Sequence, residues 1–192
     1  MTGARARLVV GVTGHRKLAD EGRLAAAVDA VLDTIVLRAA DGAVARQNKT
    51  PLQLSVLSPL AEGADRLVAE RVLAMAGAAE LEAVLPMEEA EYEADFATDA
   101  SKSEFRALLA RARTIHRLPR PSSREEAYAA AGRYVVDHCD VLIAVWDGTP
   151  GEGPGGTAET VRYARRQRRA LAWIRPDGAG YEFIDGDFGS RI

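Results

Sequence analysis

Three short segments of the sequence combine glycines with side chains that bind phosphate or ribose. The longest segment runs from Asp147 to Glu159 and contains five glycines, the last two directly before a threonine. Backbone amides at the start of a helix bind anions, and Gly155 and Gly156 leave such amides accessible while Thr157 adds a hydroxyl group. We therefore predict a phosphate site here; the alternative is a flexible surface loop with an ordinary helix cap. Two further residues predicted to bind the ligand are Asp147 and Gly148.

A second segment, residues 11–16, reads Gly-Val-Thr-Gly-His-Arg and supplies a hydroxyl group, a turn and a guanidinium group. Gly14 permits a tight turn and a close approach of the backbone to a ligand, and the planar guanidinium of Arg16 can hold two phosphate oxygens at once. The ligand-binding residues predicted in this segment are Thr13, Gly14, His15 and Arg16. The alternative is a turn glycine beside a solvated arginine.

The third segment, residues 58–65, places one carboxylate on each side of a short glycine turn. We predict that Glu62 or Asp65 accepts hydrogen bonds from ribose hydroxyl groups, as acidic residues do near nucleotide phosphate sites. The alternative is that both acids only cap a helix, because the helix dipole favours negative charge in the first turn. The other residues assigned to this part of the site are Ser58, Gly63, Ala64 and Pro86.

The three segments each follow a short apolar run and precede an amphipathic stretch. Alternation of this kind predicts a parallel sheet with helices on both faces. The predicted strands are residues 8–12, 52–57, 81–85, 114–118, 140–147 and 170–174. Ligands of open parallel sheets bind outside the carboxyl ends of the strands, which is where the three segments lie. We predict one Rossmann-like, three-layer α/β domain over residues 1–192, with a mostly parallel sheet of six or more strands.

The segments between the predicted strands supply the helices and loops. Apolar residues at three- and four-residue spacing predict a helix after Asp20, and the polar stretch 42–51 is predicted to be a loop. Residues 88–111 are predicted to form one or two helices, the second capped by Ser101 or Ser103. The remaining predictions are a helix capped by Ser122 or Ser123 that runs to His138, a helix from Thr157 to about Arg169, and a tail from Arg175 that forms a short hairpin or stays loose.

The composition excludes several classes of partner. The chain has 25 basic and 28 acidic residues, so it lacks the overall positive charge that attracts proteins to nucleic acid. No apolar run approaches the ~20 residues that span a bilayer, and Cys139 is the only cysteine, so no intrachain disulfide can form. We expect a cytoplasmic protein that binds neither membrane nor nucleic acid; its oligomeric state stays open, a homo-oligomer included.

Several familiar motifs are absent from the sequence. No Gly-x-Gly-x-x-Gly follows the first strand and no Gly-Lys-Ser/Thr occurs, which argues against an ordinary dehydrogenase or a kinase. His15, His116 and His138 lie far apart, with no cysteine or carboxylate at metal-ligand spacing, so no metal site is predicted. A nucleotide-type ligand is the one small molecule that the sequence predicts.

Taken together, the segments resemble the SLOG superfamily. The resemblance rests on residues 11–16, on Ser-Pro-Leu-Ala-Glu-Gly-Ala-Asp-Arg at 58–66, on Cys-Asp-Val-Leu-Ile-Ala-Val-Trp-Asp-Gly at 139–148 and on Gly-Gly-Thr-Ala-Glu at 155–159, and it spans most of the chain. This superfamily groups Rossmann-like nucleotide-ligand domains, including the sensor domain of melastatin-type TRP channels, DNA-processing protein A, molybdenum cofactor carriers and the Lonely Guy phosphoribohydrolases. The resemblance implies a sensor or carrier that holds an ADP-ribose-like molecule or a nucleoside monophosphate between the first-strand loop and the Gly-Gly-Thr loop.

The phosphoribohydrolases of this superfamily carry Pro-Gly-Gly-x-Gly-Thr-x-x-Glu, whose glutamate serves cleavage of the N-glycosidic bond. The corresponding segment here, residues 154–159, lacks the third glycine, and Glu159 follows Thr157 by two positions and not three. One residue on a helix is a rotation of about 100°. Glu159 is therefore the candidate catalytic residue of an alternative function, a nucleotide N-glycoside hydrolase or transferase, while ligand binding without bond cleavage is the main prediction.

Overall fold

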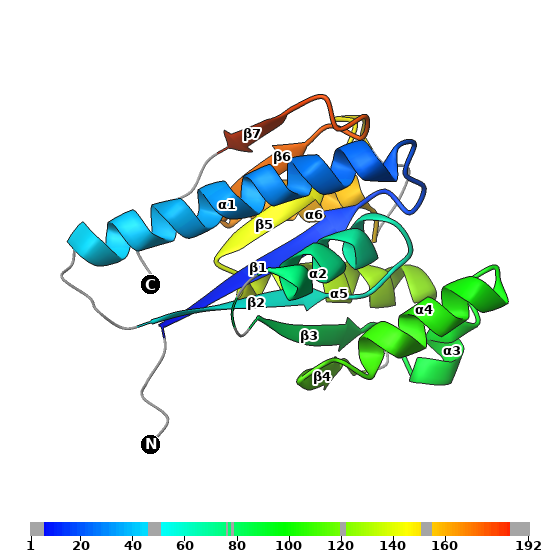
Figure 1. The fold of residues 1–192 in the computed structure, drawn as a ribbon. Coiled ribbons are helices and arrows are strands. Elements are labelled where there is room, and N and C mark those ends of the chain that lie inside the picture. Colours follow the sequence, from blue (N-terminus) through cyan, green and yellow to red (C-terminus); the bar gives the residue numbers. More distant parts are fainter. Residues whose placement is uncertain are drawn as a thin grey trace, which may run out of the picture.

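A sheet of seven strands lies at the centre of the computed structural model, which describes residues 6–45, 51–75, 77, 79–119, 122–150 and 155–184 (Figure 1). The strands are β1 (Ala6–Gly14), β2 (Leu52–Ser58), β3 (Glu80–Leu85), β4 (Thr114–Arg117), β5 (Val141–Val145), β6 (Ala170–Ile174) and β7 (Tyr181–Ile184). Their order in the sheet is β4-β3-β2-β1-β5-β6-β7. β1 to β6 pair in parallel, and β7 pairs with β6 in the antiparallel direction.

Helices cover both faces of this sheet. They are α1 (Glu21–Ala45), α2 (Ala64–Ala74), α3 (Glu89–Glu93), α4 (Asp99–Leu109), α5 (Arg124–His138) and α6 (Thr157–Arg166). α1 and α2 pack on one face and α5 and α6 on the other, while α3 and α4 lie at the carboxyl end of β3 (Figure 1). The structure thus confirms the predicted Rossmann-like, three-layer α/β fold with a mostly parallel sheet.

The central strand β1 is apolar on both sides because helices cover both. Leu8, Val10 and Val12 belong to the core cluster under α1 and α2, whereas Val9 belongs to the cluster under α5 and α6. Such strands read as continuous apolar runs, and this is why β1 is recognisable in the sequence.

The direction of the chain across the sheet reverses next to β1. The connections from β1 to β4 step toward one edge, and the chain then returns so that β5 pairs with the other side of β1. The loops that follow β1 and β5 therefore lead to helices on opposite faces of the sheet. A crevice forms between such loops, at the carboxyl edge of the sheet.

The predicted strands match the observed ones closely, but several helix boundaries were wrong. α1 continues to Ala45, so residues 42–45 of the predicted loop are helical, and residues 46–50 lie outside the described residues. The side chain of Thr98, and not Ser101 or Ser103, caps α4 by accepting from the Ser101 amide. α6 ends at Arg166, because Arg168 has a φ of 52° and cannot continue the helix.

Other predictions along the chain were correct. Ser123 caps α5 by accepting from the Glu126 amide, and the helix ends at His138, as predicted. The tail forms the predicted hairpin through β6 and β7, while residues 185–192 lie outside the described residues.

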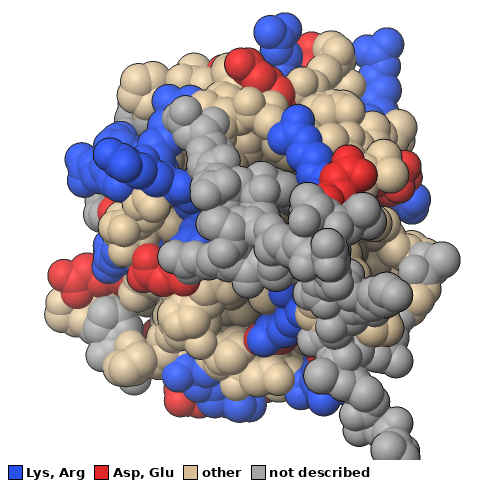
Figure 2. All heavy atoms as spheres, turned by 90° about the vertical axis from the view of Figure 1, so that its left-hand side faces the viewer, with Lys and Arg blue, Asp and Glu red and all other residues tan. Residues whose placement is uncertain are grey.

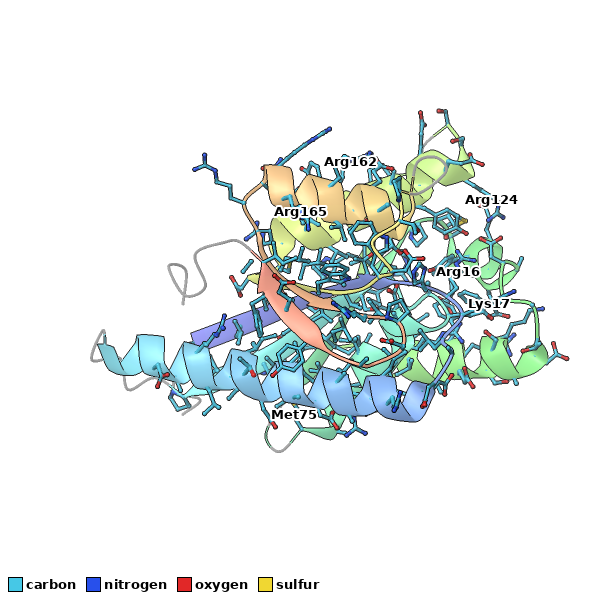
Figure 3. All side chains as sticks on the ribbon, turned by 90° about the horizontal axis from the view of Figure 1, so that it is seen from above. Arg16, Lys17, Met75, Arg124, Arg162 and Arg165 are labelled. Atoms are coloured by element: carbon cyan, nitrogen blue, oxygen red, sulfur yellow. The ribbon has the colours of Figure 1, made fainter. Side chains whose placement is uncertain are left out.

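Charged side chains of both signs lie on the face at the amino ends of the strands (Figure 2). Arg162 and Arg165 lie on α6, whereas Arg16, Lys17 and Arg124 lie together near the carboxyl edge of the sheet (Figure 3). None of the helices among the described residues has the length and apolar character needed to cross a bilayer.

Candidate functional site

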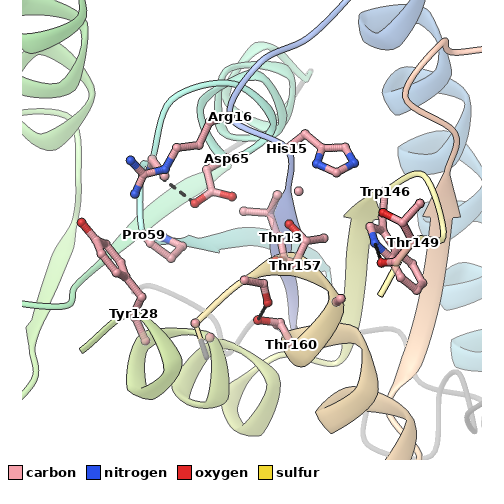
Figure 4. A pocket seen from close by; sticks show the side chains of 18 of the residues that line it. Thr13, His15, Arg16, Pro59, Asp65, Tyr128, Trp146, Thr149, Thr157 and Thr160 are labelled. Atoms are coloured by element: carbon pink, nitrogen blue, oxygen red, sulfur yellow. Dashed lines mark hydrogen bonds between the residues drawn. The ribbon is translucent and has the colours of Figure 1, made fainter. Parts of the chain in front are cut away.

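A cavity of about 330 Å³ opens at the carboxyl edge of the sheet, where β1 and β5 lie side by side (Figure 4). Its wall is built by the end of β1, the loops after β1, β2 and β5, the helix α3, the middle of α5 and the start of α6. The lining residues are Val12, Thr13, Gly14, His15, Arg16, Pro59, Ala61, Asp65, Tyr92, Tyr128, Ala131, Gly132, Trp146, Thr149, Gly155, Gly156, Thr157, Ala158 and Thr160. The cavity therefore lies at the crevice that the strand order creates.

Backbone hydrogen bonds hold the loop after β1 against both neighbouring elements. The His15 amide donates to the Val145 carbonyl of β5 at 3.1 Å, and the His15 carbonyl accepts from the Ala64 amide of α2 at 3.1 Å. Gly14 is required here, because a Cβ at this position would lie 2.5 Å from the Ala64 Cβ and 2.8 Å from the Val145 carbonyl oxygen. Thr13 and Arg16 are thus presented to the cavity on a fixed backbone.

The start of α6 closes the cavity from the opposite face of the sheet. Gly155 has a φ of 85° and packs so tightly on α5 that a Cβ would lie 2.7 Å from the Tyr128 Cβ. The N-cap residue, Gly156, provides no side-chain cap, so no side chain of that residue competes for the first amides of α6. Thr157 and Ala158 line the cavity next to these amides. The arrangement suits an anion, because helix N-termini carry partial positive charge.

Arg16 reaches along one side of the cavity toward α5. Its guanidinium lies 5.3 Å from the centre of the Tyr128 ring, and the Tyr128 hydroxyl donates to Asp95. Asp95 in turn pairs with Arg124 at 2.7 Å. Burial, followed by the hydrogen bond to Asp95, raises the pKa of Tyr128, so its hydroxyl stays protonated at neutral pH. Of the described residues that line the cavity, Arg16 is the one that carries a permanent positive charge.

Asp65 lies in the same wall and is only 6% exposed. Its Oδ2 accepts from the Ala61 amide at 3.3 Å. Burial raises the pKa of Asp65 to about 7, although the Ala61 hydrogen bond and the charges of Arg16 and Arg66 oppose this shift. At neutral pH the carboxyl group is therefore partly protonated and can either donate or accept a hydrogen bond toward the cavity.

His15 and the loop after β5 form the other side of the cavity. The Asp147 amide donates to Nε2 of His15 at 3.3 Å, and the Asp147 carboxylate accepts from both the amide and the hydroxyl of Thr149. These hydrogen bonds lower the pKa of Asp147. Trp146 donates from its indole nitrogen to the Thr149 carbonyl at 3.0 Å. Asp147 thus orients His15 and Thr149 while those two residues line the cavity.

The structure brings together about half of the residues that the sequence predicted for the site. The predicted residues that line the cavity are Thr13, Gly14, His15, Arg16, Asp65, Gly155, Gly156 and Thr157. Those outside the lining are Ser58, Glu62, Gly63, Ala64, Pro86, Asp147, Gly148 and Glu159. Three members of the second group, Ser58, Ala64 and Asp147, hydrogen-bond to Asp65 or His15 of the first group.

Two predicted residues at the end of β2 and in the loop after it have partners inside the fold. Ser58 is buried, and its hydroxyl accepts from the Leu60 amide at 3.0 Å and donates to the Asp65 carbonyl at 3.3 Å. Glu62 accepts from the Ser101 hydroxyl of α4. Of the two acids that the sequence offered for ribose, only Asp65 lines the cavity.

Glu159 turns back onto its own helix start. Its Oε2 accepts from the Gly155 amide at 2.6 Å, and its Oε1 lies 3.5 Å from a guanidinium nitrogen of Arg133. A glutamate at the third helical position often bonds an amide before the helix in this way. The carboxylate therefore holds the Gly155 turn in place.

We expect Glu159→Ala to lower the free energy of unfolding by ~1 kcal/mol, because the Gly155 amide and Arg133 lose their partner. Glu159→Gln should cost less, since its amide oxygen can still accept from Gly155. Urea denaturation of both variants measures the difference. A wild-type protein that releases free base from a nucleotide, and a Glu159→Gln variant that does not, would instead make Glu159 catalytic.

Sequence reasoning missed the residues that α3 and α5 contribute. Tyr92, Tyr128 and Gly132 line the cavity but lie in helices that carry no anion-binding pattern. One signal was present: Ala131 and Gly132 are adjacent small residues within a helix, and a Cβ on Gly132 would lie 2.6 Å from the Thr160 hydroxyl of α6. Such small pairs indicate that another element approaches closely.

Among the described residues, no three His, Cys, Asp or Glu side chains cluster as metal ligands would. A comparison of the chain with protein-family models found no matching family, and a comparison with curated proteins found no match.

Proposed function

We propose that this protein binds a nucleotide-derived small molecule, either ADP-ribose-like or a nucleoside monophosphate, and acts as a sensor or carrier. The observation that carries the proposal is that two elements of the kind that bind anions, a helix N-terminus and a loop with an arginine, line one cavity. The start of α6 at Gly156 and Thr157 faces the loop from Thr13 to Arg16. The SLOG-like sequence pattern of the same loops supports the same conclusion.

The shape of the cavity suits a phosphate in the middle with organic groups beside it. Arg16, Asp65 and Tyr128 lie on one side of Thr157, and His15 and Trp146 lie on the other (Figure 4). Small-molecule sites range from about 300 to 1,000 Å³, and a cavity of about 330 Å³ lies at the small end of that range. This size favours a mononucleotide or one half of a larger ligand.

Calorimetric titration with ADP-ribose, AMP, GMP and NAD tests the proposal, and we expect saturable binding of at least one of them. Thr157→Glu should weaken that binding at least ~10-fold, because its carboxylate repels the phosphate at the start of α6. The same substitution should stabilise the fold by ~0.5 kcal/mol through the helix dipole.

Thr157→Gln is the matched control, since it has a similar size without the charge. It should affect binding less than Thr157→Glu does. A folded wild-type protein that binds none of the four nucleotides would disprove the proposed function.

A further inference from the structure

Tyr92 of α3 is fully buried, yet its hydroxyl has no hydrogen-bond partner among the described residues. Its ring is fixed by edge contacts with Phe96 at 5.1 Å and Phe105 at 5.6 Å, measured between ring centres. The residue nevertheless lines the cavity. Buried hydroxyl groups nearly always find a partner, and leaving one unpaired lowers stability. A hydrogen-bond partner that a bound ligand supplies would satisfy the Tyr92 hydroxyl.

Asp65 adds a second polar group to the same wall. Within the described residues its carboxyl group uses only Oδ2 in a hydrogen bond, with the Ala61 amide. Tyr92 and Asp65 line the same cavity. Burial, and then the charge of Asp65, raises the pKa of Tyr92 well above its ordinary value, so the phenol stays neutral. A neutral phenol and a carboxyl group can each donate or accept a hydrogen bond.

These two groups do not suit a phosphate, because the buried carboxyl group would repel it. They suit neighbouring hydroxyl groups, each of which also donates and accepts. In a nucleotide the sugar adjoins the phosphate, and Asp65 and Tyr92 share one cavity with the start of α6. On the basis of the proposed function, we propose that Tyr92 and Asp65 form a ribose subsite, in which Tyr92 donates to one hydroxyl oxygen and Asp65 accepts from the adjacent hydroxyl group.

The subsite makes Tyr92 a specificity-determining residue for ribose over deoxyribose. The wild-type protein should bind AMP about tenfold more tightly than it binds 2′-deoxy-AMP or 3′-deoxy-AMP, because a missing sugar hydroxyl leaves a buried partner unpaired. Tyr92→Phe should remove most of the preference over the deoxynucleotide that lacks the hydroxyl contacted by Tyr92, because it weakens AMP binding and leaves the binding of that deoxynucleotide unchanged. The preference over the other deoxynucleotide depends on Asp65 and should remain.

The same variant separates a ligand contact from a structural role. Without ligand, Tyr92→Phe should raise the melting temperature by about 2–6 °C, since it removes an unpaired buried hydroxyl and keeps the ring. Tyr134→Phe is the matched control, because its hydroxyl bonds to Nδ1 of His116 at 2.9 Å outside the cavity lining. That control should lower the melting temperature and leave AMP affinity unchanged.

Calorimetry of wild type, Tyr92→Phe and Tyr134→Phe with AMP and both deoxynucleotides completes the test. Equal affinities of the wild type for AMP and both deoxynucleotides, or a Tyr92→Phe variant that keeps the wild-type preference for AMP over both deoxynucleotides, would overturn the ribose subsite and leave the proposed function intact. A wild-type protein that binds no nucleotide would overturn the proposed function itself, and the subsite with it.

Discussion

Replacing Gly63 by alanine is expected to destabilise the protein by ~3 kcal/mol or more. Gly63 has a φ of 79° and a ψ of −120°, a region that is essentially restricted to glycine. A Cβ at this position would lie 2.4 Å from the carbonyl oxygens of both His15 and Arg16. Because these two oxygens are backbone atoms, the clash can be relieved only if the whole loop after β1 moves. Chemical denaturation should show the loss of stability, and nucleotide titration a weaker site.

Gly156→Ala is the control for this prediction. Gly156 also lies beside the cavity, but its φ is −91° and a Cβ there would meet no atom within 4 Å. Its substitution should cost no more than ~1 kcal/mol, the usual difference between glycine and alanine at a helix cap. If Gly63→Ala unfolds at the same denaturant concentration as the wild type, the loop does not depend on this contact.

Asp65→Asn is expected to change how stability depends on pH. Burial raises the pKa of Asp65 to about 7 in the folded protein, whereas an aspartate in an unfolded chain ionises near ~3.9. Between these values the folded state binds the extra proton, so this residue lowers stability progressively as the pH rises from about 4 to about 7. Above about pH 7 this loss of folding stability is complete, and it amounts to at most ~4 kcal/mol.

The asparagine variant should therefore be more stable than the wild type by about 2–4 kcal/mol at pH 8, and the two should differ little at pH 4. Its amide oxygen can still accept from Ala61, while the neighbouring charges of Arg16 and Arg66 lose their carboxylate. Urea denaturation across this pH range gives the difference curve. Glu70→Gln, on the exposed side of α2, is the control and should leave the curve flat; an equally flat curve for Asp65→Asn would contradict the role of burial.

The sequence was sufficient to predict the centre of the sheet because the central strands are apolar on both faces. β1 and β5 are recognisable as short continuous apolar runs, and their loops must then meet at the carboxyl edge. Local patterns were weaker at helix ends. The cap of α4 is Thr98, which precedes both predicted caps, Ser101 and Ser103, because several hydroxyl side chains follow one another here and their order alone does not identify the first turn.

The site was predictable where its chemistry is local and was missed where it depends on packing. Thr13, Arg16 and Thr157 lie in short segments whose composition indicates anion binding, and the structure places them around one cavity. Tyr92 lines the same cavity from a five-residue helix, and only the fold shows that its buried hydroxyl has no hydrogen-bond partner in the described part of the chain. Glu62 and Asp65 look equivalent in sequence, but only burial in the fold distinguishes them.

The hydrogen bond from the His15 amide to the Val145 carbonyl joins two parts of the chain that are 130 positions apart, and the cavity requires both. No fragment of the sequence that lacks either end of this bond contains the complete site. A ligand would therefore recognise only the assembled sheet. By mass action it would stabilise the folded population as a whole, by about 2.7 kcal/mol at a concentration one hundred times its dissociation constant. In a sensor or carrier of this kind, the fraction of protein that holds ligand would therefore rise together with the stability of the folded protein.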